Sequence, residues 1–343
     1  MSTTVGTTRA GAPAGTPALP EPRGPLSEAV VTVLAHGRDP ASVPQAEAER
    51  ADPYGDDLAL AMHICYELHY HGFRSVSPEW EWDPDLLRVR AALERTFLHA
   101  LRCDVDGGTD VEAVLDALLT EPVPGTGIAH HLRDTAPWWQ MREYFAHRSI
   151  YHLKEADPHA WVIPRLQGQA KASLVAVEFD EFGGGRGEHI HARLFADLME
   201  AAGLDSAYLH YLDDVPAPAI GIVNLMSMLG LHRGLRGALV GHFTAAEIST
   251  APSAQRITRG LERLGAGPEC TLFFTEHIEA DAVHEQIMRR DVIGDLLDRE
   301  PELLTDVVFG IQATELLEGK LAQYLFGAWH EERTSLRRPL PME

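Results

Sequence analysis

Residues 275–286, TEHIEADAVHEQ, decide both the fold class and the candidate chemistry of this chain. Neither Gly nor Pro interrupts the stretch, so an α-helix is expected. In that helix His277, Asp281 and His284 stand at positions i, i+4 and i+7, which share one stripe of the surface. Imidazole and carboxylate groups are common ligands of transition metals. The stripe predicts a site for one or two metal ions, with a solvated polar face as the competing interpretation.

Two further segments carry ligand-type residues at helical spacing. In GRGEHIHARLF, residues 185–195, Glu188 and His191 stand at i and i+3, the carboxylate-x-x-His spacing of di-iron helical bundles. In SIYHLKEADPHAW, residues 149–161, Glu155 stands near the end of a long expected helix. Each segment is weak evidence alone, since ion pairs and caps use the same residues. Their joint presence with the 275–286 stripe favours a metal site.

A third segment, LVAVEFDEFGGG at residues 174–185, places Glu178 and Glu181 among apolar residues. A charged group in such surroundings requires a counter-charge or a metal ion. Glu181 stands seven residues before Glu188 across a glycine turn. It could therefore face the same site.

The rest of the chain is also patterned as helices. Apolar periodicity bounded by Pro and Gly predicts helices over residues 56–72, 83–103, 109–120, 138–156, 159–182 with a bend at Pro164, 187–202, 217–231, 233–249, 252–264, 268–290 and 302–330. Strand signals are nearly absent. Residues 1–26 contain few large apolar side chains and are expected to form a disordered tail.

Composition narrows the class of protein. The 343 residues are 45% apolar, which suffices for one large helical core. A formal net charge of −22 disfavours nucleic acid and anionic lipid as partners. No apolar run approaches the roughly 18 residues of a membrane span. Three scattered cysteines fit a reducing compartment, so we expect a cytoplasmic protein.

Four motifs together resemble one known family. YHLKEADPHAW, VEFDEFGGGRGEHIHARLF, LHRGLRGALVGHF and EHIEADAVHEQ are similar to the haem-oxygenase-like di-iron oxidases, also called iron-containing redox enzymes. The resemblance runs from Trp138 to Trp329 and more weakly back to Asp56. It implies an all-α, haem-oxygenase-like helical bundle with an N-terminal helical extension. The expected boundaries are a tail at 1–26, an N-terminal helical region at 27–135, a di-iron core at 136–335 and a tail at 336–343.

The resemblance also implies a ligand set and cofactors. In the family that the chain resembles, two irons are bound by a glutamate from one helix, a glutamate and a histidine from a second, and a His-x3-Asp-x2-His set from a third. The matching positions are Glu155, Glu188, His191, His277, Asp281 and His284. Some N-oxygenating members use a further carboxylate where Glu181 stands. The implied cofactors are two Fe(II)/Fe(III) ions with O2 as co-substrate, and a single iron on the same ligands is an alternative.

The activity that the resemblance implies is oxidation of a small carboxylate-bearing metabolite in natural-product biosynthesis. We expect an aliphatic amino acid that loses hydrogen from carbon, giving desaturation, cyclisation or C–C cleavage. N-oxygenation of an amino acid or amine and oxidative decarboxylation of a fatty acid are the alternatives. Arg233 and Arg236 are candidates to bind the substrate carboxylate. An external electron donor and a homodimer are compatible with this scheme.

Other classes of protein remain as rivals. A haem-binding protein would leave most of the carboxylate and histidine positions unused. A thiaminase-like hydrolase would require a nucleophilic cysteine, for which Cys270 is the candidate by position. A metal-stabilised helical scaffold would bind iron without turnover. His242 and Glu247 resemble groups that orient metal ligands from behind.

Overall fold

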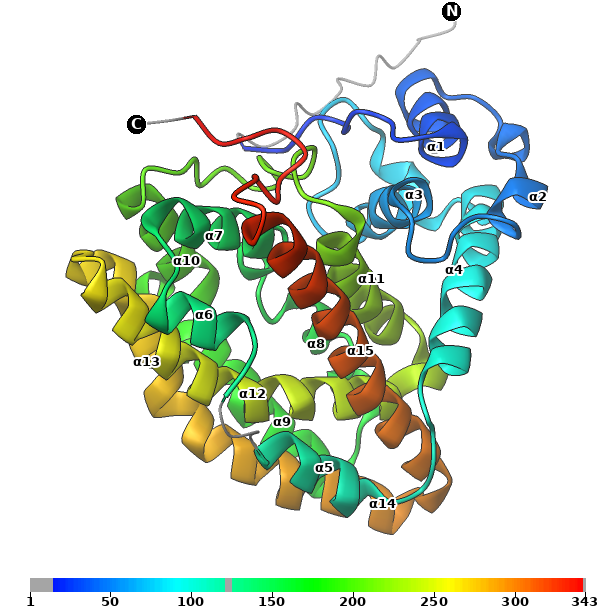
Figure 1. The fold of residues 1–343 in the computed structure, drawn as a ribbon. Helices are drawn as coiled ribbons and strands as arrows, with labels where there is room; N and C mark the ends of the chain where they lie inside the picture. The colour runs from blue at the N-terminus through cyan, green and yellow to red at the C-terminus, as the bar shows by residue number, and fades with distance from the viewer. Residues whose placement is uncertain (1–14, 121–124, 342–343) are drawn as a thin grey trace, which may run out of the picture.

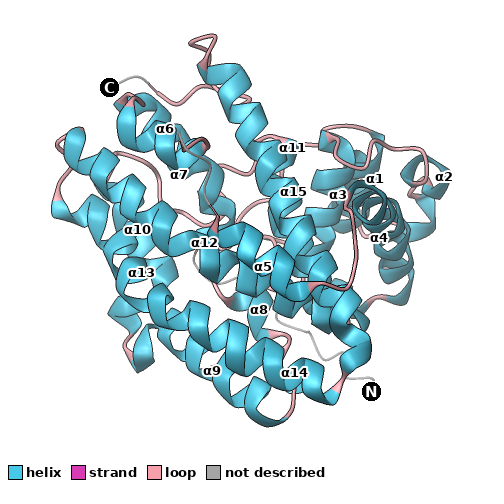
Figure 2. Cartoon of the chain, turned by 60° about the horizontal axis from the view of Figure 1, so that its bottom comes forward, coloured by secondary structure: helices cyan, strands magenta, loops and turns pink. Residues whose placement is uncertain are grey.

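The computed structural model describes residues 15–120 and 125–341, except for the side chains of residues 279–282. Throughout this part the regular structure is helical and no strand occurs (Figure 2). The expectation of an all-α fold is therefore confirmed. None of the described helices is both long enough and apolar enough to cross a membrane.

Six helices form the N-terminal region (Figure 1). They are α1 Pro25–His36, α2 Gln45–Ala48, α3 Asp56–Glu67, α4 Pro84–Asp104, α5 Val111–Leu119 and α6 Ile128–Asp134. Of these, α3 packs against α11 (Ala217–Leu231), α5 against α15 (Leu304–Trp329) and α6 against α12 (Arg236–Arg263). Asp83 begins α4, because its carboxylate accepts hydrogen bonds from the backbone N–H groups of Asp85 and Leu86.

Nine helices follow. They are α7 Trp138–His152, α8 Asp157–Ala160, α9 Gly168–Glu181, α10 His191–Ala201, α11 Ala217–Leu231, α12 Arg236–Arg263, α13 Pro268–Gln286, α14 Gly294–Arg299 and α15 Leu304–Trp329. A π-helical segment, Ile287–Ile293, joins α13 to α14. Buried apolar residues from Leu26 to Leu336 form one continuous core, so the N-terminal region shares its core with the rest.

The structure differs from the sequence expectation in three helices. The predicted helix 159–182 is instead two helices, α8 and α9, separated by a 3-10 turn at Ile163–Arg165. The predicted helix 187–202 begins only at His191, after a 3-10 turn at Gly187–His189. Helix α12 continues through Pro252, where we expected a break, because packing against α13 and α15 holds both of its halves in line.

Helices α12 and α15 approach closely through two glycines. A Cβ atom at Gly241 would collide with the backbone carbonyl of Val307, and one at Gly310 would collide with that of Ala238. Only glycine permits this separation of the two backbones. The contact holds α12 and α15 together where both line the cavity described below.

Both predicted tails make contacts in their described parts. Arg23 donates to the backbone carbonyl of Leu212, and the backbone N–H of Glu21 donates to Asp213. At the other end, the backbone carbonyl of Pro341 accepts from Arg142 at 3.4 Å. Residues 1–14 and 342–343 lie outside the described residues.

Candidate metal centre

Four helices and one turn bring buried carboxylates and imidazoles together in the interior. Glu155 lies in the turn after α7, Glu181 at the end of α9, His191 at the start of α10 and Glu247 on α12. Helix α13 contributes His277 and His284 from one face, two turns apart, as the spacing predicts. All six side chains are buried.

The first group consists of Glu155, Glu181, His191 and His277. One ligand atom from each lies within 4.8 Å of the others. Nδ1 of His191 is 2.8 Å from a carboxylate oxygen of Glu181, and Nε2 of His277 is 3.8 Å from Oε1 of Glu155. Two carboxylates and two imidazoles are a donor set that suits iron.

The second group consists of Glu181, Glu247 and His284, again within 4.8 Å. Nδ1 of His284 is 3.2 Å from Glu247 and 3.9 Å from Oε1 of Glu181. Glu181 therefore belongs to both groups, with Oε2 near His191 and Oε1 near His284. A carboxylate between two sets of donors can bridge two metal ions.

The orientation of His277 fits a metal ligand. Its Nδ1 lies 2.7 Å from the carbonyl oxygen of Phe273, one turn earlier on α13. Because a carbonyl only accepts hydrogen bonds, Nδ1 carries the proton and Nε2 presents its lone pair toward Glu155. Such a bond from the distal nitrogen to a carbonyl is the usual support of a ligating histidine.

The electrostatics of the two groups also favour cations. Burial, with Glu181 and Glu247 nearby, raises the pKa of Glu178 to about 9. Burial alone would lower the pKa of His284, but the adjacent Glu247 carboxylate raises it to about 9. The described ion pairs of Glu155, Glu181 and Glu247 are with histidines and none is with Lys or Arg. A buried anionic cluster of this kind is stabilised by bound metal ions.

Two of the sequence-predicted ligands are not among these groups. Glu188 is exposed in the 3-10 turn Gly187–His189, because α10 begins only at His191 and therefore does not carry the two residues on one helical face. The side chain of Asp281 lies outside the described residues.

Glu247, expected to orient ligands from behind, instead offers a ligand atom of its own. Its signal in the sequence is a lone carboxylate in the apolar stretch 237–248.

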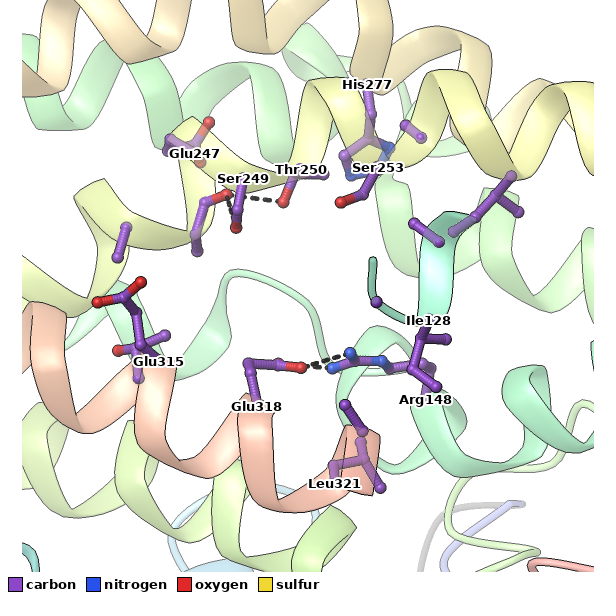
Figure 3. A pocket seen from close by; sticks show the side chains of 18 of the residues that line it. Ile128, Arg148, Glu247, Ser249, Thr250, Ser253, His277, Glu315, Glu318 and Leu321 are labelled. Atoms are coloured by element: carbon purple, nitrogen blue, oxygen red, sulfur yellow. Dashed lines mark hydrogen bonds and ion pairs between the residues drawn. The ribbon is translucent and has the colours of Figure 1, made fainter. Parts of the chain in front are cut away.

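A cavity of about 580 Å³ adjoins the first group (Figure 3). Its wall includes Glu155, Glu181 and His277 together with Tyr151 and His242. Helix α7 also contributes Arg148, and α15 contributes Glu315 and Glu318.

Neither Arg233 nor Arg236 lines this cavity. Arg233 is exposed, and Arg236 pairs with Glu300. The two predicted carboxylate-binding arginines are therefore not part of the cavity wall.

Cys270 does not fit the hydrolase alternative. It is buried at the start of α13 and is absent from the cavity wall. Burial raises the pKa of its thiol, which opposes formation of the nucleophilic thiolate.

A helical fold with a buried carboxylate and imidazole cluster is typical of metal-binding helical proteins. This chain belongs to the iron-containing redox enzyme family. Residues 142–319 match that family, a range that contains every described residue of both groups. The chain is also similar to nitrosourea synthase from Streptomyces achromogenes subsp. streptozoticus, with 26% identity over 266 residues. The match covers 73% of this chain and 55% of the relative, so the chain spans about half the length of the curated relative it matches.

Proposed function

We propose that this protein is a non-haem di-iron, O2-dependent oxidoreductase. The observation that carries the proposal is the position of Glu181, which is shared by two groups of potential ligands. One iron would be held by Glu155, His191 and His277, the other by Glu247 and His284, with Glu181 between them. Asp281, four residues after His277 in the sequence, stays a predicted ligand.

Bound iron would supply the electrons and the Lewis acidity that O2 activation requires. The chain's own residues hold the site and control protons. Glu178 is protonated at neutral pH and lies three residues before Glu181, so it is a proton reserve beside the cluster. Tyr151 lines the cavity, and burial together with Glu155 raises the pKa of its hydroxyl. It therefore keeps its proton and can donate a hydrogen bond to a bound substrate.

We propose N-oxygenation of an amine-bearing small molecule as the reaction, ahead of the C–H oxidation expected from the sequence. The name of the relative, nitrosourea synthase, and the buried position of Glu181 support this order. In the balanced reaction, one oxygen atom of O2 forms a bond to nitrogen. The other leaves as water after accepting two electrons from an external donor and two protons.

C–H oxidation of an aliphatic amino acid is the second candidate, because apolar side chains such as Phe243, Phe274 and Leu325 form part of the cavity wall. A fatty acid is less suitable. The same wall holds the carboxylates of Glu315 and Glu318, which a long apolar chain would desolvate without offering them a hydrogen-bond donor.

Glu181 and Glu188 offer a matched pair of variants to test the site. Both are carboxylates flanking the same glycine turn, but only Glu181 is buried among the ligands. Glu181→Gln is expected to lower the iron content of protein loaded anaerobically with Fe(II), while Glu188→Gln retains two irons per chain. Iron content is measured by metal analysis after removal of unbound iron. Full loading of Glu181→Gln, or loss of iron from Glu188→Gln, would contradict the ligand assignment.

The reaction is tested by exposing the Fe(II)-loaded protein to O2 with a panel of amino acids and amines. O2 consumption that depends on one substrate, with a product heavier by one oxygen atom, is expected. A product lacking two hydrogens would favour C–H oxidation instead. Iron binding without substrate-dependent O2 consumption would favour the scaffold alternative.

A further inference from the structure

We propose that Arg148 and Glu318 form the part of the cavity that recognises the charged ends of a zwitterionic α-amino acid. In this arrangement the substrate carboxylate contacts Arg148 and its ammonium contacts Glu318. The inference rests on the proposed function, since it treats the cavity as the substrate site of the oxidoreductase.

The pair consists of two opposite charges that face one cavity. Arg148 donates from both terminal nitrogens to the two carboxylate oxygens of Glu318, at 2.7 and 2.6 Å. Figure 3 shows the two side chains pointing toward each other from α7 and α15. Their side chains are 19% and 38% exposed, so the pair is accessible from the cavity without being a surface pair.

The pair can bind a zwitterion without leaving a charge uncompensated. A guanidinium has five N–H donors and a carboxylate has about four lone-pair positions, so each group can contact a substrate charge while its partner stays nearby. The ring of Tyr144 lies 5.4 Å from the Arg148 guanidinium and limits its orientations. An amine without a carboxylate, or an acid without an ammonium, would satisfy only one half of the pair.

The position of the pair relative to the metal groups also fits a substrate end. Arg148 stands one helical turn before His152 on α7, a separation of about 6 Å along the helix axis. Nδ1 of His152 lies 2.8 Å from Oε1 of Glu155, so α7 spans from the charged pair to the first ligand group. The charged end of the substrate would therefore be held away from the metals, with its side chain directed toward them.

Binding to the Fe(II)-loaded protein without O2 tests the pair separately from turnover. The probes are L-norleucine, pentylamine, which lacks its carboxylate, and hexanoate, which lacks its ammonium. We expect the wild type to bind norleucine at least roughly tenfold tighter than either probe, the usual scale of one charge-assisted hydrogen bond. Arg148→Gln should lose the preference over pentylamine, and Glu318→Gln the preference over hexanoate.

Two controls separate recognition from folding. Arg148→Lys keeps the positive charge and should retain a preference over pentylamine. The double variant Arg148→Gln with Glu318→Gln is neutral at both positions and leaves no unpaired charge, and it should bind iron normally while losing both preferences. Unchanged preferences in the single variants, or a wild type that does not favour norleucine, would overturn the proposal. Failure of the proposed function would appear differently, as absence of substrate-dependent O2 consumption in the wild type.

Discussion

Lys154→Met is expected to destabilise the protein and to weaken iron binding, although Lys154 does not contact the metal groups. The side chain is completely buried, and its ammonium donates to Oε2 of Glu67 on α3 at 2.9 Å. It also lies 4.2 Å from the centre of the Tyr70 ring. Because Glu155 is the next residue, this contact anchors the turn that carries a predicted ligand to the N-terminal region.

The size of the effect follows from the burial of the pair. Glu67 would retain the hydroxyl of Tyr208 as a donor, but it would lose the only Lys or Arg with which it pairs in the described structure. Removing one partner of a buried ion pair costs about 3–5 kcal/mol. At roughly 1.4 °C per kcal/mol for a chain of this size, the midpoint of thermal unfolding should fall by about 4–7 °C. Ala156 adds to the effect on iron, since its φ of 72° is strained and depends on its surroundings.

Urea and thermal denaturation of the metal-free protein measure its stability, and an Fe(II) titration measures iron binding. The double variant Lys154→Met with Glu67→Gln should be less destabilised than the sum of its single variants, because it leaves no buried charge without a partner. Lys171→Met on α9 is the control, since Lys171 is partly exposed and should change neither measurement appreciably. The reasoning is refuted if Lys154→Met unfolds within about 1 kcal/mol of the wild type, or if the double variant shows the full sum.

Two further predictions concern stability. Gly241→Ala should lower the free energy of unfolding by about 1–3 kcal/mol or more, because the added Cβ forces α12 away from Val307. Gly327→Ala is the control, since Gly327 faces open space on α15 and its replacement should be neutral or slightly stabilising. Equal urea midpoints for the two variants would contradict the close approach of α12 and α15. The metal-free protein should lose stability as pH rises from 4.5 toward about 9, because the unfolded chain releases the Glu178 proton that the folded chain retains. Glu178 should contribute at most about 1.4 kcal/mol per pH unit to this slope, and His284, whose pKa is also raised to about 9, should add to it above pH 6.5. The slope should shrink in Glu178→Gln, and an identical pH dependence of unfolding in that variant would refute this assignment.

Much of the fold could be predicted from local pattern. Helix α11 matches the expected range 217–231, and α13 carries His277 and His284 on one face as their spacing requires. Both predictions depend only on helical periodicity and on where Pro and Gly stand. That information is local, so it is present in the sequence before any packing occurs.

The choice between Glu181 and Glu188 could not be made in this way. The two residues flank Gly183–Gly185, all three of which have positive φ, and nothing in the spacing shows how the chain turns there. The turn keeps Glu181 inside at the end of α9 and exposes Glu188 before α10 begins. The spacing of Glu188 and His191 predicts a continuous helix, whereas the chain forms a 3-10 turn at Gly187–His189.

By itself the sequence determined the helical class, the α13 stripe and the family to which the chain belongs, because these follow from periodicity and from motifs within single segments. Only the tertiary structure decided that Glu247 joins Glu181 and His284, and that Arg148 meets Glu318 across 170 residues of chain. Contacts between distant segments depend on how the helices pack, and side-chain spacing within one helix contains no record of that packing.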